Sequence, residues 1–115
     1  MKMIFHLHPD IFETVKNGKK DIEVRLNDEK RKKLKVGDKI IFLKRPLEKE
    51  KIEATVKDLK YFESLEEVVN TYDMERIYYP YLTKEEYINE MERYYSKDKQ
   101  KQLKIVCIIY EKDWL

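Results

Sequence analysis

The chain has 115 residues, of which 42% are hydrophobic and 42% are charged, and this length favours a single domain over residues 1–115 with a buried core. The 25 Lys and Arg residues nearly balance the 23 Asp and Glu residues, so the net charge of +2 excludes a strongly basic protein that binds DNA nonspecifically. The single cysteine, Cys107, excludes an internal disulfide framework.

The apolar stretches are too short to span a membrane, and the N-terminus is too polar for a secretory signal. We therefore expect a cytoplasmic protein that does not insert into a membrane. The sequence does not specify an oligomeric state, and we assume a monomer. With two glycines and many Lys, Glu, Ile and Tyr residues, the composition is also typical of a heat-adapted protein, although an AT-rich genome produces the same bias.

The first three predicted elements are a strand, a helix and a second strand. The apolar stretch 3–8 predicts the first strand, and Pro9 suits the first turn of a helix, where a backbone N–H is not needed. Asn17 and Gly18 predict the end of this helix. In the stretch 22–26, hydrophobic and charged residues alternate, which predicts a strand with one apolar and one charged face.

The middle of the chain predicts two further strands. A turn at 36–38 leads into the strand 39–43, and a polar connection at 46–51 leads into a long strand at 52–62. The charged segment 27–35 before them predicts a turn or a single helical turn. This segment contains the densest group of basic residues in the chain, Lys30, Arg31, Lys32, Lys33 and Lys35.

Two capping-box patterns predict a pair of helices. Ser64 precedes Glu67 by three residues, and Thr83 precedes Glu86 by three, so each hydroxyl and carboxylate can satisfy backbone N–H groups at a helix start. Residues 73–82 between the two helices are rich in tyrosine and are predicted to be irregular. The second helix places three tyrosines on one stripe, which predicts a core position for Tyr87, Tyr94 and Tyr95.

The stretch 103–110 is apolar on both faces and predicts a central strand, in which Cys107 is a buried packing residue rather than a nucleophile. Trp114 is expected to pack against the end of this strand. Short, mostly antiparallel strands with one long helical insertion are typical of a small, partly closed β-barrel flanked by helices. We therefore predict an α+β fold with about five strands.

The charged face of the second predicted strand is the main candidate site. Glu23 and Arg25 are two residues apart, so their side chains point the same way. A guanidinium can bind a phosphate or a base edge, and a carboxylate can accept from an exocyclic amine or activate water. Lys20 lies at the entrance of the strand after the flexible Gly18 and can swing over the same groove. The alternative is a solvated strand face and a solvated lysine.

Other residues qualify as candidate contacts, each with a structural alternative. His8 can donate or accept a hydrogen bond at the edge of a cleft, or be merely structural. Tyr79 lies in the irregular segment, where an exposed ring can stack on a base or pack in the core. The basic segment can follow a phosphate backbone or form a solvated turn. His6 and His8 lack a third ligand, so we predict neither a metal site nor another cofactor.

Two linked motifs run from the first helix to the third strand. They read Phe12-x-x-Val15-x-x-Gly18-x-Lys20-x-Ile22-Glu23-x-Arg25 and Val36-Gly37-Asp38-x-Ile40-x-Phe42. Together they resemble the ASCH domain, which belongs to the PUA-like superfamily of small β-barrels. The resemblance covers nearly the whole chain, since the helical insertion and the last hydrophobic strand also fall where this family has them.

The resemblance implies RNA binding in a cleft between the barrel and its helices. Some ASCH proteins of similar size hydrolyse the acetyl amide of N4-acetylcytidine with a lysine, a threonine nucleophile and a glutamate, and at least one other member is reported as a ribonuclease. By position, Lys20 matches the lysine, Glu23 occupies the place of the nucleophile, and Glu75 is the candidate for the inserted acid. Because Glu23 has no hydroxyl, its remaining catalytic role is as a general base on water.

The sequence thus predicts a PUA-like domain that binds RNA or a modified nucleoside. The expected ligand contacts are Lys20, Glu23, Arg25, His8 and Tyr79. The alternative is a hydrolase of an acylated nucleoside or a ribonuclease, with Lys20, Glu23 and Glu75 as catalytic residues, and the sequence leaves open whether the protein is an enzyme. A protein-interaction module is a third possibility.

Overall fold

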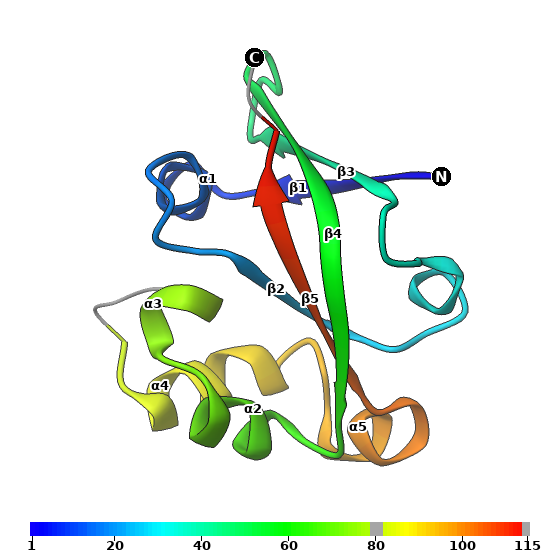
Figure 1. The fold of residues 1–115 in the computed structure, drawn as a ribbon. Helices are drawn as coiled ribbons and strands as arrows, with labels where there is room; N and C mark the ends of the chain where they lie inside the picture. Colours follow the sequence, from blue (N-terminus) through cyan, green and yellow to red (C-terminus); the bar gives the residue numbers. More distant parts are fainter. Residues whose placement is uncertain (79–81, 114–115) are drawn as a thin grey trace.

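The computed structural model describes residues 1–78 and 82–113 and has the predicted α+β fold (Figure 1). In this part of the chain, five strands form one mixed, mostly antiparallel sheet that curls into a half-barrel. β1 and β3 run parallel, while the other neighbouring strands run antiparallel. In spatial order the strands are β1 (Lys2–Leu7), β3 (Lys39–Lys44), β4 (Lys51–Phe62), β5 (Ile105–Lys112) and β2 (Ile22–Leu26).

The helices lie on two sides of the half-barrel (Figure 1). The N-terminal helix lies beside β1, whereas the inserted helices gather near β2 and the far ends of β4 and β5. The structure adds two helices to the predicted pair: one falls in the segment predicted to be irregular, and another precedes β5. The helices are α1 (Pro9–Lys16), α2 (Leu65–Thr71), α3 (Met74–Ile77), α4 (Lys84–Glu92) and α5 (Lys97–Leu103), with a 3-10 turn, η1 (Arg31–Lys33).

Side-chain caps explain where three of these helices begin. Thr83 Oγ1 accepts a hydrogen bond from the Glu86 backbone N–H at 3.1 Å, and Glu86 Oε1 accepts one from the Thr83 N–H at 2.9 Å, which completes the predicted capping box of α4. At the start of α2, Ser64 Oγ accepts from the Glu67 N–H at 3.3 Å, but Glu67 Oε1 accepts from the Glu63 N–H and not from that of Ser64, so the predicted capping box is only half formed. Ser96 caps α5 at 3.3 Å, and this serine is the sequence signal that the prediction missed.

The two faces of the sheet bury two hydrophobic clusters, and β5 contributes to both. Alternate residues of β5, such as Ile108, face the interior of the half-barrel, while residues of the opposite parity, such as Cys107, face the inserted helices. This arrangement confirms the predicted central strand. Cys107 is fully buried, and burial raises the pKa of its thiol to about 12, so it remains a packing residue at neutral pH.

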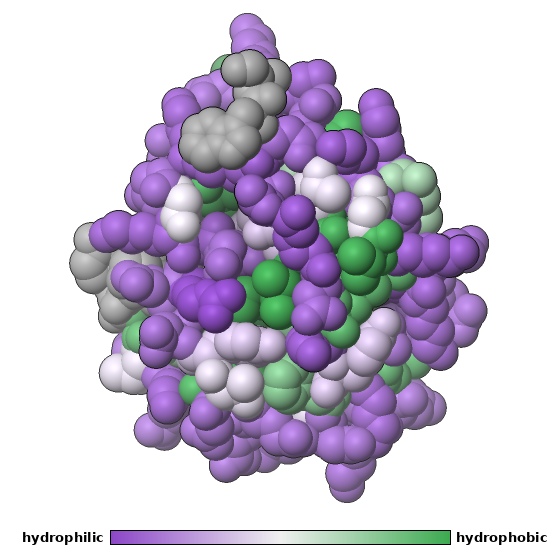
Figure 2. Space-filling view, viewed as in Figure 1, coloured by the Kyte–Doolittle hydropathy of each residue, from purple (hydrophilic) through white to green (hydrophobic). Residues whose placement is uncertain are grey.

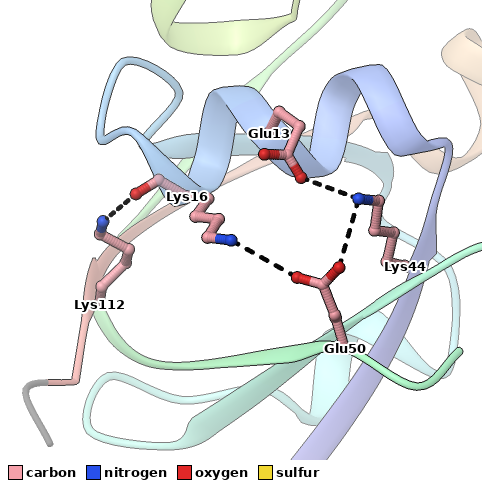
Figure 3. Close-up of polar contacts among 5 residues, drawn as sticks. All are labelled: Glu13, Lys16, Lys44, Glu50 and Lys112. Atoms are coloured by element: carbon pink, nitrogen blue, oxygen red, sulfur yellow. Dashed lines mark hydrogen bonds and ion pairs between the residues drawn. The ribbon is translucent and has the colours of Figure 1, made fainter.

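Ion pairs on the surface attach α1 to β3 and to the turn that follows it (Figure 3). Lys44 Nζ lies 3.1 Å from Glu13 Oε2 and 3.4 Å from Glu50 Oε1, and Lys16 Nζ lies 3.5 Å from Glu50 Oε2. Lys112 Nζ donates a hydrogen bond to the carbonyl of Lys16. Because these groups are largely exposed, each pair stabilises the fold by at most about 1 kcal/mol.

The surface is mostly hydrophilic on the face seen in Figure 1. Hydrophobic side chains gather near the centre of this face, over β4 and β5, and hydrophilic ones surround them (Figure 2). Within the described residues, no helix combines the length and the apolar character that a membrane span requires.

Candidate functional site

A cavity of about 180 Å³ lies between the start of α1, the strand β2 and the helices α3 and α4. It is slightly larger than the ~150 Å³ cavity that admits benzene in an engineered protein, so it has room for one planar ring. Lys20, Glu23 and Arg25 line it from β2 and the residues just before that strand. Among the described lining residues, four are tyrosines: Tyr78, Tyr87, Tyr94 and Tyr95.

β2 carries this charged group because both of its faces are buried. Glu23 and Arg25 pair in the sheet with Ile108 and Val106, which face the interior of the half-barrel. The apolar residues of β2 face the inserted helices instead. Glu23 is only 5% exposed, so the alternative of a solvated strand face is wrong for this residue.

Lys20 is held rigidly at the edge of the cavity. Its side chain is 2% exposed, and its ammonium donates to the carbonyl of Ile77 at 2.8 Å and to the carbonyl of Ile22. It also forms an ion pair with Glu23 Oε1 at 3.1 Å. Two backbone carbonyls and the Glu23 carboxylate thus surround the ammonium group. Lys20 therefore lines the cavity as a buried, fixed cation, not as a lysine that swings over it.

The backbone before β2 explains how Lys20 reaches this place. Gly18, with a φ of 85°, ends α1 in the left-handed region that glycine tolerates. The Lys20 backbone N–H then donates to the carbonyl of Thr14 at 3.0 Å, while the Tyr110 hydroxyl donates to the Lys20 carbonyl at 3.0 Å. These two hydrogen bonds, to α1 and to β5, hold the Lys20 backbone so that its side chain points toward the cavity.

Glu23 accepts from Arg25 as well as pairing with Lys20. Its Oε2 accepts a hydrogen bond from Arg25 Nε at 2.8 Å and lies 2.8 Å from Arg25 Nη2. Arg25 is 23% exposed in its side chain and places its guanidinium 4.6 Å from the centre of the Phe5 ring. Because Phe5 belongs to β1 and Arg25 to β2, this contact joins the two edge strands across the open side of the half-barrel.

The charges of this group determine which protonation states are stable. Burial raises the pKa of Glu23, but the positive charges of Lys20 and Arg25 outweigh it and hold the pKa of this carboxyl below its ordinary value of 4.5. Burial lowers the pKa of Lys20 from its ordinary 10.5, and the Glu23 carboxylate offsets part of that change. At neutral pH Glu23 is therefore a carboxylate, which can only accept hydrogen bonds.

Three buried side-chain atoms have no hydrogen-bond partner within the described part of the chain. They are Glu23 Oε1, Asn27 Oδ1 and Arg31 Nε, and all three lie on β2 or in the segment that directly follows it. Glu23 Oε1 has the ion pair with Lys20 but makes no hydrogen bond. Buried polar groups are nearly always hydrogen-bonded. The three unpaired atoms in this one region therefore mark it as a candidate ligand site.

The other acidic candidates occupy different places. Asp21 has the parity of Glu23, but its carboxylate accepts from Arg76 Nε and Nη2 at 2.8 and 3.0 Å and does not line the cavity. Glu75 lies on α3 with an exposed side chain and is not part of the cavity wall. Glu90 of α4 lines the cavity instead. Glu90 follows Tyr87 by three residues and so lies beside the predicted tyrosine stripe of this helix. This spacing is the sequence signal that could have indicated Glu90.

The remaining predicted contacts lie at the rim or outside the described residues. His8, just before α1, lines the cavity with an exposed side chain, and His6 lines it too while its Nδ1 lies 2.5 Å from Glu48 Oε1. Tyr79 and Trp114 fall outside the described residues. Tyr87 is 1% exposed, as predicted for the core.

Tyr94 differs from its prediction. The sequence placed it in the core with Tyr87, whereas its side chain is 59% exposed at the edge of the cavity. The reason is that α4 ends at Glu92, so the helical stripe does not continue to this residue. Tyr94 therefore presents its ring to solvent where a ligand would enter.

Comparisons with known proteins identify the family of this chain. Residues 5–112 match the ASCH domain. The crystal structure of the hypothetical protein PH0355 is 32% identical, with 98% of this chain and 100% of that chain covered and a TM-score of 0.85. The solution NMR structure of protein PF0455 from Pyrococcus furiosus is 29% identical, with 97% of each chain covered and a TM-score of 0.76.

A more distant structure shows the same fold. The crystal structure of ASCH from Zymomonas mobilis is 15% identical, with 94% of this chain and 65% of that chain covered and a TM-score of 0.65. No protein with a curated description matches the chain. The match over residues 5–112 confirms the resemblance seen in the two sequence motifs, and the chain belongs to the ASCH domain family of the PUA-like superfamily.

Proposed function

We propose that this ASCH domain binds a single base, from RNA or from a modified nucleoside, in the cavity beside β2. The observation that carries the proposal is the Glu23 carboxylate, a buried and charged group that lines the cavity and whose Oε1 has no hydrogen-bond partner among the described residues. The cavity volume of about 180 Å³ supports a single planar ring as the bound group.

Each side chain around the cavity has a distinct role in this proposal. Glu23 Oε1 accepts a hydrogen bond from an exocyclic amine or a ring N–H of the base. Arg25, whose side chain is 23% exposed, donates to a carbonyl or phosphate oxygen. Lys20 has its ammonium held by two carbonyls and paired with Glu23, so it positions Glu23 instead of contacting the ligand. The exposed ring of Tyr94 stacks on the base.

The hydrolase alternative receives less support from the same geometry. Among the described residues that line the cavity, none is a serine, threonine or cysteine, which removes the usual nucleophiles of acyl transfer. Water activation by Glu23 would be inefficient, because the lowered pKa makes this carboxylate a weak base at neutral pH. Incubation with N4-acetylcytidine, followed by measurement of cytidine release, tests this alternative directly.

Two tyrosines of equal exposure allow a matched test of binding. Tyr94 at the cavity and Tyr61 on β4 are both 59% exposed, but only Tyr94 lines the cavity. In calorimetric titrations with the four ribonucleosides, N4-acetylcytidine and short single-stranded RNAs, Tyr94→Ala should weaken binding about tenfold, as expected for the loss of one stacked ring. Tyr61→Ala should bind like the unaltered protein.

A second measurement locates the ligand. Addition of the bound nucleoside or RNA should shift the NMR resonances of residues 20–25, which include Lys20, Glu23 and Arg25. If none of these compounds binds, or if binding leaves those resonances unchanged, the proposed site is wrong.

A further inference from the structure

The turn η1 brings a second arginine to the Phe5 ring that Arg25 contacts. The guanidinium of Arg31 lies 5.4 Å from the centre of the Phe5 ring, on which Arg25 also lies. Arg31 is only 16% exposed in its side chain, although it follows β2 in a charged surface segment. Leu34, 4% exposed in the half-barrel core, anchors this segment and thereby holds Arg31 in place.

The carboxylate partners of these cations are shared or partly exposed. The buried one, Glu23, serves both Lys20 and Arg25. Arg31 has Asp28 as its partner, at 3.4 Å from Nη1 to Oδ2, and the Asp28 side chain is 39% exposed. Two guanidiniums near one ring repel each other, and an anion that binds both lowers that repulsion.

Arg31 also has a donor that no described residue uses. Its Nε is buried and has no hydrogen-bond partner among the described residues, and Asn27 Oδ1 nearby in sequence is in the same state. Tyr95 connects Arg31 to the base cavity, because it lines that cavity and interacts with both arginines. Burial raises the pKa of the Tyr95 hydroxyl, and the positive charges of Arg25 and Arg31 oppose this rise. Exposed lysines surround Arg31 in sequence, namely Lys30, Lys32, Lys33 and Lys35.

We propose that Arg31 and Arg25 together bind a phosphate group beside the base cavity, so that the ligand of this site is a nucleoside phosphate and not a free nucleoside. The proposal rests on the proposed function for the position of the base. A guanidinium presents several N–H donors that fit phosphate oxygens, and those of Arg25 that do not face Glu23 serve this role. The negative charge of a phosphate also lowers the repulsion between the two guanidiniums. The phosphate can belong to a mononucleotide or to an RNA strand.

The test compares phosphorylated and unphosphorylated forms of one ligand on the full chain. Calorimetry measures the four ribonucleosides, their 5′- and 3′-monophosphates and trinucleotide RNAs. The best monophosphate or trinucleotide should bind about tenfold or more tightly than its nucleoside, as expected for charge-assisted hydrogen bonds. An advantage for the monophosphate identifies a terminal phosphate, whereas an advantage for the trinucleotide alone identifies a phosphodiester.

Variants assign the advantage to Arg31. Arg31→Gln should reduce the advantage to nearly nothing and leave nucleoside affinity unchanged, while Arg31→Lys should retain part of it because the charge remains without the planar fork. Lys57→Gln is the matched control, since Lys57 is an exposed β4 lysine paired with Glu111 at 3.3 Å, away from the cavity. The proposal is overturned if the phosphorylated ligand binds no more tightly than its nucleoside, or if Arg31→Gln leaves this difference in affinity unchanged.

An NMR measurement keeps the test valid if Arg31→Gln does not fold. In the unaltered protein, the Arg31 Nε–Hε resonance should shift with the phosphorylated ligand and not with the nucleoside; no shift overturns the proposal. Nucleoside binding without a phosphate advantage leaves the proposed function standing and removes only the phosphate site. If no nucleoside or RNA binds, the proposed function fails, and titration with inorganic phosphate at the Arg31 resonance then decides the phosphate site by itself.

Discussion

The Arg25 guanidinium and the Phe5 ring, 4.6 Å apart, connect the two edge strands of the sheet. β1 and β2 are not neighbours in the sheet, so their side chains close the half-barrel where backbone pairing ends. The same Arg25 holds Glu23 in the candidate site. One side chain therefore contributes both to the closure of the half-barrel and to the geometry of the candidate site.

The contact between Arg25 and Phe5 should be measurable as a coupling energy. In a double-mutant cycle with Phe5→Leu and Arg25→Lys, we expect a coupling of about 1 kcal/mol in the free energy of unfolding, because the planar guanidinium stacks on the ring and an ammonium does not. Urea denaturation supplies the four free energies. Phe5→Leu with Arg45→Lys, at an exposed arginine, is the control and should show no coupling.

Removing the buried ammonium should destabilise the protein much more than removing an exposed one. Lys20→Met leaves the carbonyl of Ile77 without its donor and Glu23 with one cation fewer, so we expect a loss of about 3 kcal/mol in the free energy of unfolding. Lys16→Met removes an ion pair at 58% exposure and should cost less than about 1 kcal/mol. Equal effects of the two substitutions in urea denaturation would contradict the buried arrangement of Lys20.

The stability contributed by Glu23 should depend on pH in a defined direction. Burial raises the pKa of Glu23, but Lys20 and Arg25 bring it below the ordinary 4.5 in the folded state. Such a group stabilises the fold above its unfolded pKa, and this contribution is lost as the pH falls through the folded pKa. We expect the unaltered protein to exceed Glu23→Gln in stability at neutral pH, and the difference to shrink below about pH 4.5.

Urea denaturation of both proteins between about pH 3 and pH 7 measures this difference. The comparison isolates Glu23, since every other titrating group is common to the two chains. A difference that stays constant over this range, or that grows as the pH falls, would show that the Glu23 carboxylate is not stabilised by the two cations.

The capping box of α4 should contribute to the stability of the cavity wall. Thr83→Ala removes the acceptor of the Glu86 N–H, and we expect the free energy of unfolding to fall by about 1 kcal/mol. Thr83→Ser retains the hydroxyl and should restore most of that loss. Thermal unfolding of the three proteins provides the comparison, and an equal loss in both variants would assign the effect to the methyl group of Thr83 instead of the cap.

Local signals in the sequence predicted most of the elements and the membership in the ASCH family. The alternation at 22–26, the glycine stop at Gly18 and the Thr83 capping box each act over a few neighbouring residues, and the structure contains each of them. The missed elements carry weaker local signals. α3 has four residues, and Ser96, the N-cap of α5, has no acidic residue three positions later to complete a capping box.

The acid of the cavity wall illustrates the limit of the sequence. Glu75 and Glu90 both lie in the helical insertion, and the pattern favoured Glu75 by alignment alone. The packing of α4 against β2 places Glu90 at the cavity and leaves Glu75 exposed. No periodicity within the insertion encodes the direction in which a whole helix packs.

By itself, the sequence determined the strand that carries Glu23 and Arg25 and the fact that both side chains share one face, because alternation is a property of the backbone of any strand. Only the tertiary structure decided that this face is buried, that Lys20 is fixed by the carbonyl of Ile77, and that Arg31 joins Arg25 on the Phe5 ring. These relationships join residues distant in the chain, so burial and charge at the site arise from how the sheet closes and not from any local pattern.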